Sequence, residues 1–179
     1  MTEEELIQGC VKKISGHQRL LFERYAGKMM SVCLRYANDQ HVAQDILQTG
    51  FIRVFDNIHQ FRHEGSFEGW MKRIFANVAL RHLSKKKLDF REIGDRHVDG
   101  ISEDPSVFSK ISEAEIHAMI RMLPDGYRTV FNLNIIEGYS HDEIAEMLKI
   151  QPGTSRTQLL KARKMLQGLI LKSFNLITV

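Results

Sequence analysis

Apolar residues recur at steps of three and four along most of the chain, the spacing that places side chains on one face of an α-helix. The alternating apolar and polar runs typical of strands are absent from the first hundred residues, and no proline precedes Pro105. The pattern predicts an all-α protein.

In the first half, this spacing predicts four helices. Three of them span about residues 3–14, 17–35 and 42–61, and the fourth begins after Ser66, a candidate N-cap. Their apolar faces comprise Leu20, Leu21, Tyr25, Met29, Val32 and Cys33, then Val42, Ile46, Val54, Phe55, Ile58 and Phe61, then Phe67, Met71, Ile74, Phe75 and Val78. Gly50 costs its helix up to about 1 kcal/mol relative to alanine. It indicates either a close approach by another element or simple tolerance.

Between Leu88 and Lys110 the composition changes, because acidic residues, glycines and Pro105 replace the apolar spacing. We interpret residues 89–110 as a flexible acidic linker between two small helical domains, residues 1–88 and 111–179. After the linker, the spacing predicts a short helix ending at Leu123, a turn at residues 124–126 and a helix over residues 127–137.

The remaining residues predict a helix-turn-helix. Ser140 and Glu143 form a capping-box pair, so the first helix should begin at His141 and end near Leu148. Residues 150–153 interrupt the pattern, and Pro152 suits the first position of a second helix.

The second helix of this motif has two different faces. Ser155, Leu159, Ala162, Leu166 and Leu169 share one face, and Arg156, Thr157, Leu160, Lys161 and Lys164 share the other. Residues 151–172 include five Lys or Arg and no Asp or Glu. This concentration of charge predicts a recognition helix for the major groove of DNA; the alternative is a solvated basic helix.

A second polar surface is expected on the fourth helix, where Lys72, Arg73, Asn77 and Arg81 follow the polar loop of residues 62–66. Cations hold phosphates and an amide bonds a splayed base, so the surface suits single-stranded nucleic acid. The alternative is a solvated helix face with Phe67 and Trp70 in the core.

Composition and short motifs argue against several classes of protein. The 179 residues carry a net charge of only +3, so charge matters here through its local clustering. Cys10 and Cys33 lack a CxxC spacing, and His59 and His63 complete no metal motif. There is no phosphate-binding glycine loop, signal peptide or membrane-spanning apolar run. We therefore expect a reduced, cytoplasmic protein that is not an enzyme and holds neither metal nor cofactor.

Three stretches resemble the extracytoplasmic-function (ECF) sigma factors of the sigma-70 family. The first runs from Asp45 to Phe55, the second from Phe61 to Asn77, and the third from Leu123 to Arg163. They resemble, in that order, the helix that binds the polymerase clamp, the loop and helix that open the -10 element, and the domain that recognises the -35 element. The resemblance covers nearly the whole chain.

The resemblance implies a role for each stretch. Asp45, Gln48, Phe51 and Arg53 would bind the beta-prime clamp helices of core RNA polymerase. Asn77 and the loop residues His63, Glu64, Gly65 and Ser66 would hold a flipped base of the -10 element, and Lys72, Arg73 and Arg81 its phosphates. Arg156, Thr157, Leu160, Lys161 and Lys164 would face the -35 duplex.

Three positions depart from the family pattern. Thr49 replaces an acidic residue, so one charge contact to the clamp is expected to be absent. Ser155 replaces a buried valine, which predicts looser packing in the helix-turn-helix. Gln158 and Lys161 replace arginines, so promoter preference should differ, because lysine lacks the bidentate fork of arginine.

The family implies core RNA polymerase, through its clamp helices and beta flap, and promoter DNA as partners, and an anti-sigma factor as a candidate regulator. The alternative from another class is an autonomous helix-turn-helix regulator that binds operator DNA without polymerase.

Overall fold

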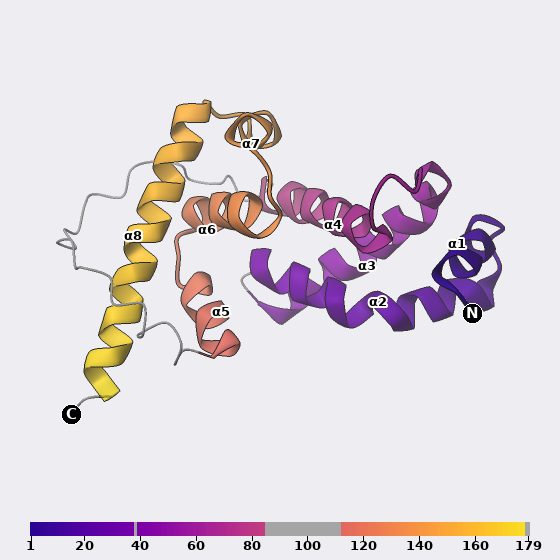
Figure 1. The fold of residues 1–179 in the computed structure, drawn as a ribbon, viewed down its shortest axis with the longest axis horizontal. Helices are drawn as coiled ribbons and strands as arrows, with labels where there is room; N and C mark the ends of the chain where they lie inside the picture. The colour runs from indigo at the N-terminus through magenta and orange to yellow at the C-terminus, as the bar shows by residue number, and fades with distance from the viewer. Residues whose placement is uncertain (38, 85–111, 178–179) are drawn as a thin grey trace. The chain divides into compact units, whose positions relative to one another are not determined.

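The structure, a computed structural model, describes residues 1–37, 39–84 and 112–177, and this part of the chain contains helices and no strands. The chain divides into two compact units, Met1–Lys87 and Leu88–Val179 (Figure 1). The all-α prediction is confirmed. The linker expected at residues 89–110 lies outside the described residues.

The first unit is built from four α-helices and one short 3-10 turn. These are α1 (Glu3–Val11), α2 (Ser15–Tyr36), α3 (Gln40–Asn57), η1 (Ile58–Gln60) and α4 (Phe67–Ser84). Helices α2, α3 and α4 pack against one another, and α1 lies against α2 and η1. Met29, Ile46 and Phe75 are among the buried residues that form the core. The three mutually packed helices provide a rigid support for side chains on their outer faces.

Three expectations for this unit were wrong. The helix expected to run to residue 61 ends at Asn57 and is followed by the 3-10 turn η1. Helix α1 ends three residues early because Lys13 adopts a left-handed conformation (φ 57°), and the Ile14 N–H bonds back to the Gly9 carbonyl at 3.0 Å. This is a Schellman-type helix end, made here without glycine. Leu20, expected on the apolar face of α2, is 44% exposed, whereas Leu21 is fully buried. Adjacent helix positions differ in direction by about 100°, so only one of the two leucines can face the core.

Gly50 lies where α3 passes close to α4. A Cβ atom built on Gly50 would lie 2.3 Å from Cε1 of Phe75. A close approach, rather than tolerance, therefore explains this glycine.

We expect Gly50→Ala to destabilise the first unit by about 1–3 kcal/mol, because the added methyl overpacks the α3–α4 contact. Urea unfolding followed by the fluorescence of Trp70, the only tryptophan, measures this. Gly27→Ala in α2 is the matched control, since a Cβ there meets nothing within 4 Å. The control should gain up to about 1 kcal/mol from helix propensity. Equal stability of the two variants would contradict the steric explanation.

The second unit is formed around one long helix. Its elements are α5 (Glu113–Arg121), α6 (Asp125–Phe131), the π-helix η3 (Asn132–Ile136), α7 (His141–Leu148) and α8 (Pro152–Ile177). Helices α5, α6 and α7 all pack against α8. Leu123, Tyr127 and Ala162 form a buried cluster, with Phe131 and Leu166 packed against it.

The chain entering the helix-turn-helix differs from expectation. The turn expected at residues 124–126 is already helical from Asp125, because Pro124 takes the N-cap position. The helix expected to continue to residue 137 widens after Phe131 into the π-helix η3. A π-helix is rare and often marks a functional segment, and this one leads directly to α7.

The helix-turn-helix itself is confirmed with its predicted boundaries. The Ser140 hydroxyl accepts from the Glu143 N–H at 3.2 Å, and the Glu143 carboxylate accepts from the Ser140 N–H at 2.8 Å. Helix α7 ends at a left-handed Lys149 (φ 55°), and α8 begins at Pro152. No described helix combines the length and apolar character needed to cross a bilayer.

Candidate functional site

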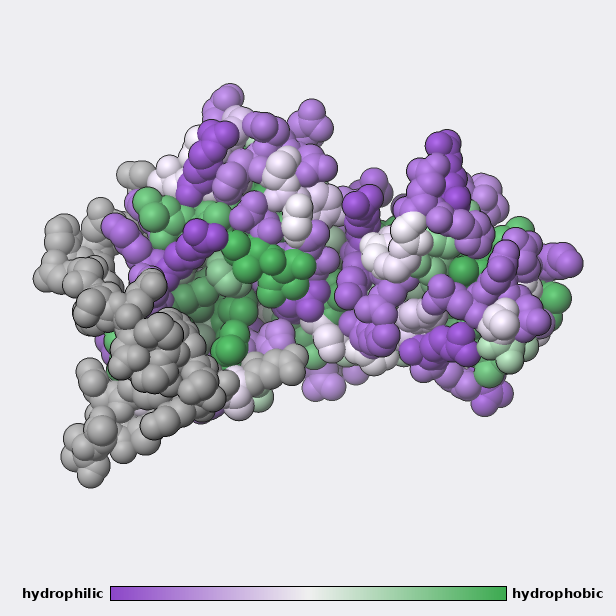
Figure 2. Space-filling view, in the orientation of Figure 1, coloured by the Kyte–Doolittle hydropathy of each residue, from purple (hydrophilic) through white to green (hydrophobic). Residues whose placement is uncertain are grey.

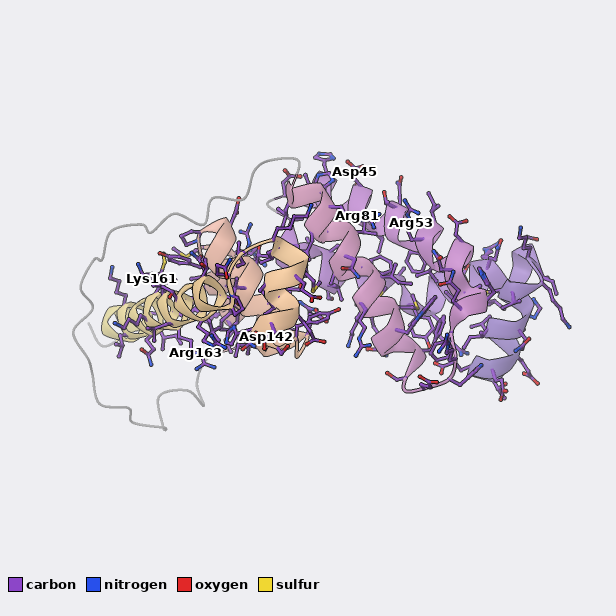
Figure 3. All side chains as sticks on the ribbon, turned by 90° about the horizontal axis from the view of Figure 1, so that it is seen from above. Asp45, Arg53, Arg81, Asp142, Lys161 and Arg163 are labelled. Atoms are coloured by element: carbon purple, nitrogen blue, oxygen red, sulfur yellow. The ribbon has the colours of Figure 1, made fainter. Side chains whose placement is uncertain are left out.

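Helix α3 presents one continuous exposed face, which we call the α3 face. It comprises Asp45, Gln48, Thr49, Ile52, Arg53 and Asp56, all exposed. Asp45 and Arg53 are labelled in Figure 3. Steps of three and four residues align these side chains along the helix. The α3 face therefore contains three of the four residues expected to bind polymerase.

The fourth, Phe51, is placed differently. It is only 3% exposed, and its ring packs on Phe22 at 4.7 Å and Phe75 at 5.3 Å between centroids. A side chain held in the core cannot present its ring to a partner, so Phe51 supports the α3 face from beneath.

The neighbouring Ile52 is the apolar residue of the α3 face, and the sequence interpretation gave it no role. Its side chain is 60% exposed, among the most exposed large apolar residues of the described chain. On the view in Figure 2, polar side chains cover most of the surface and apolar side chains interrupt it in patches. A single exposed apolar residue is common on protein surfaces, so it is the polar residues around Ile52 on the same face that make it a candidate contact for a partner.

The loop before α4 is set on an aromatic platform. The rings of Phe61, Phe67 and Trp70 lie 5.2–5.6 Å apart, and His63 lies 4.7 Å from Phe61. His63 and Gly65 both have positive φ (60° and 110°), so the loop turns through uncommon backbone conformations at these two positions. The Ser66 hydroxyl accepts from the Gly69 N–H at 3.1 Å, which confirms Ser66 as the N-cap.

The polar residues expected on α4 fall into two sets. Arg73, Asn77 and Arg81 are exposed and follow each other at steps of four, so they extend from the loop along one line of the helix. Lys72 lies on the flank, with its ammonium 2.9 Å from the Glu68 carboxylate. We call this assembly, residues 62–66 with Lys72, Arg73, Asn77 and Arg81, the loop–α4 surface.

Helix α8 separates packing from exposed positions as expected, with one exception: Gln158, expected to affect promoter preference, is only 2% exposed and faces the core. Ser155, Leu159 and Ala162 are buried, whereas Arg156, Leu160 and Lys164 are exposed and Thr157 and Lys161 are half-exposed. These last five residues form what we call the α8 face. Leu160 is 56% exposed, so the face has an apolar centre between basic side chains. Such a combination suits base edges: cations bond acceptors and an apolar group contacts a thymine methyl.

Arg163 is also exposed, but it lies on the opposite side of α8 from Lys161 (Figure 3). Two residues of helix correspond to a rotation of about 200°, which explains the separation. Arg163 follows Arg156 by seven residues, about two helical turns, so it lies on the same side of α8 as Arg156, at the edge of the α8 face.

A polar contact joins the two helices of the helix-turn-helix. The Ser155 hydroxyl, fully buried, lies 2.8 Å from Nδ1 of His141, the first residue of α7. The small serine was expected to loosen packing. The structure shows that His141, which the sequence interpretation overlooked, reaches across the turn and bonds it.

We expect His141→Ala and Ser155→Val each to destabilise the second unit by about 1 kcal/mol, because each leaves one partner of a shielded hydrogen bond unsatisfied. The double variant should cost less than the sum of the two. Hydrogen exchange of the α7 and α8 amides in the full chain measures all three. Strictly additive effects would contradict the pairing.

The cysteines provide no reactive centre. Cys10 and Cys33 are buried, and burial raises the pKa of their thiols to about 11 and about 12. A thiol that stays protonated is a poor nucleophile and metal ligand. In the described parts of the chain, no three His, Cys, Asp or Glu side chains are grouped to hold a metal ion.

Two family models match the chain. They are sigma-70 region 2, over residues 21–88, and sigma-70 region 4, over residues 113–166. The first match spans most of α2 together with α3 and α4, and therefore includes the α3 face and the loop–α4 surface. The second match includes the helix-turn-helix with the α8 face.

Full-length relatives agree with these matches. The ECF RNA polymerase sigma factor SigW of Bacillus subtilis is 33% identical, with coverage of 80% of this chain and 83% of the relative. The RNA polymerase sigma-H factor of Pseudomonas aeruginosa is 29% identical, with coverage of 92% and 93%. The ECF RNA polymerase sigma-E factor of Escherichia coli is 27% identical, with coverage of 92% of both chains.

Solved structures share the fold. The sigma factor RpoE of Bartonella quintana, in complex with the anti-sigma factor NepR, superposes with a TM-score of 0.53 at 16% identity, covering 86% of this chain and 96% of that one. CnrH, in complex with the cytosolic domain of CnrY, gives a TM-score of 0.50 at 19% identity, covering 92% and 94%.

Proposed function

The chain belongs to the extracytoplasmic-function group of the sigma-70 family of RNA polymerase sigma factors, and we propose that it uses three separate surfaces to bring core RNA polymerase to promoters. The α3 face binds the clamp helices of the beta-prime subunit. The loop–α4 surface captures the -10 element, and the α8 face recognises the -35 element, with the second unit held near the beta flap.

The main observation that supports three separate roles is that all three surfaces are exposed. Asp45, Arg73 and Arg156, one from each surface, all lie on the outside of helices whose opposite sides form the cores. The α8 face belongs to a different compact unit from the other two. Two units can engage two promoter elements at once, and each contact raises the effective concentration of the other.

Capture of the -10 element follows from the loop–α4 geometry. A base edge is fully accessible only outside the stack, and extracting a base costs a few kcal/mol. The rings of Phe61 and Trp70 beside the loop provide stacking surfaces for a base, and the exposed Asn77 provides a donor and an acceptor. Polymerase binding and -35 contacts offset the cost of opening the duplex.

The protein acts as a specificity subunit in the cytoplasm, where the polymerase carries out the chemistry; it has no catalytic residue of its own in this proposal. Its partners are core RNA polymerase and promoter DNA. An anti-sigma factor is a further partner, supported by the complex of RpoE with the anti-sigma factor NepR.

The test is run-off transcription by purified core polymerase, with and without this protein, on genomic fragments that include its own upstream region. New start sites that require the protein are the expected result. Specific binding to duplex DNA without polymerase, and no new transcripts, would instead support an autonomous regulator.

In the same assay, Arg156→Ala should lower promoter-dependent transcription about tenfold, because a lost arginine–base contact costs about 1–3 kcal/mol. Binding to core polymerase should be unchanged. Arg121→Ala, which removes an exposed arginine at the end of α5, is the matched control and should remain close to wild type. Equal losses in both variants would argue against base recognition by the α8 face.

A further inference from the structure

One carboxylate of the first unit is held between two lysines from different helices. Glu68, in the first turn of α4, has one oxygen 2.5 Å from the ammonium of Lys28 on α2 and the other 2.9 Å from the ammonium of Lys72. The two lysine side chains are 59% and 38% exposed, so water and solutes reach both.

The charges of this bridge fit an anion site. Hydrogen bonds from Lys28 and then Lys72 lower the pKa of the Glu68 carboxyl, so Glu68 is ionised at neutral pH. Each carboxylate oxygen takes one ammonium, the arrangement that two oxygens of a backbone phosphate would also accept. Lys28 and Lys72 are thus already positioned around one negative group.

Resting on the proposed role of the loop–α4 surface, we propose that Lys28 and Lys72 form a phosphate site for single-stranded DNA, which the Glu68 carboxylate occupies in the free protein. Lys28 has no part in the three surfaces described above. The site extends the path of the strand from α4 across to α2.

This arrangement makes Glu68 an internal competitor of DNA. A phosphate can use both lysines only when the carboxylate moves aside, so Glu68 weakens the binding of any strand held by its backbone alone. A promoter strand that is also held through a captured base can displace it. Glu68 therefore favours promoter DNA over unrelated single strands.

The test uses the full chain and a fluorescein-labelled oligothymidine of about 20 nucleotides, long enough to cover a single-strand binding surface. Anisotropy gives the dissociation constant over a range of NaCl concentrations. Glu68→Gln should bind several-fold more tightly than wild type. For this variant, the slope of log affinity against log NaCl concentration should become steeper by about 0.7 for each lysine that binds a phosphate.

Glu23→Gln is the matched control, because it removes one carboxylate that pairs with Arg19 on the same helix at 2.8 Å, outside the bridge. It should leave the salt slope unchanged. If Glu68→Gln matched Glu23→Gln in affinity and slope, the proposal would be overturned. Unfolding followed by Trp70 fluorescence checks that both variants fold.

Lys28→Gln tests the site without altering Glu68. Alone it should leave oligothymidine binding close to wild type, because Glu68 already occupies the site, and combined with Glu68→Gln it should remove about 0.7 of the gained slope. A double variant that kept the whole gained slope would show that Lys28 binds no phosphate. Arg73→Ala separates this result from the role of the loop–α4 surface. If Arg73→Ala weakens binding and Glu68→Gln changes neither affinity nor slope, the surface binds DNA and the phosphate site is wrong. If Arg73→Ala also has no effect, the DNA role of the whole surface fails.

Discussion

Ile52→Glu is expected to weaken binding to core RNA polymerase by about 100-fold, the effect of losing one interface hot spot. Ile52 is 60% exposed in the middle of the α3 face, so a partner that covers this face removes it from water. Burying such a side chain contributes about 1.5–3 kcal/mol. A glutamate in its place would add the cost of desolvating a carboxylate between Asp45 and Asp56.

The measurement is the affinity of labelled protein for core polymerase, together with unfolding followed by Trp70 fluorescence. Ile14→Glu is the matched control: the same substitution at another exposed isoleucine, before α2 and away from the α3 face. The paired Asp45→Ala and Gln48→Ala changes should have a smaller effect, because polar groups at an interface exchange water for partner contacts. Wild-type affinity of a folded Ile52→Glu protein would remove the α3 face as the polymerase contact.

Helix boundaries followed from the sequence wherever a cap is local. The Ser140–Glu143 capping box, the Ser66 N-cap and Pro152 at the start of α8 are all found as expected. Each of these signals involves residues within one turn of each other, so no knowledge of the tertiary structure is needed. The left-handed ends at Lys13 and Lys149 gave no such signal, because glycine is the usual residue there.

Which side of a helix is exposed was harder to predict. The family resemblance rests on matching residue types along the sequence, and on that basis it implied that Phe51 contacts polymerase. The position of the Phe75 ring decides that Phe51 faces the core and Ile52 faces solvent. Both residues are large and apolar, so periodicity alone does not distinguish them. Leu20 and Leu21 present the same ambiguity on α2.

Polar contacts between elements were not predictable at all. Lys28 reaches Glu68 from 40 residues away, and His141 reaches Ser155 from 14. Each pair depends on how two helices cross, and neither leaves a repeating pattern in the sequence. The roles of these side chains therefore depend on the tertiary structure and cannot be derived from the sequence pattern.

Arg128 is the strongest example of such a contact, and its loss should have the largest effect on stability. Although it is an arginine, it is only 4% exposed. Its guanidinium donates to the Arg121 carbonyl at 3.2 Å and to the Asp125 carboxylate at 2.6 Å. Burial lowers the pKa of Arg128, and Asp125 opposes this shift. The carbonyl belongs to the last residue of α5, where helix carbonyls lack partners within the helix.

We expect Arg128→Ala to destabilise the second unit by roughly 2–4 kcal/mol, since it leaves a cavity and removes the donor that caps α5. Hydrogen exchange of the α5 amides in the full chain should accelerate by about 100-fold, because each 1.4 kcal/mol is a factor of ten. Arg121→Ala is the matched control, as it removes an exposed arginine and keeps the same carbonyl. Arg128→Lys should be intermediate, because lysine keeps the charge without the fork that reaches two acceptors.

Because the chain forms two compact units, the effect of Arg128→Ala should be confined to the second unit. Because Arg128 lies in the second unit and Trp70 in the first, Arg128→Ala should leave the Trp70 unfolding transition unchanged. Transcription that depends on the -35 element should fall, since α5 and α6 hold α8 in place. Loss of both units together would show that they fold as one cooperative body, and unchanged α5 exchange would show that the buried guanidinium does not anchor α5.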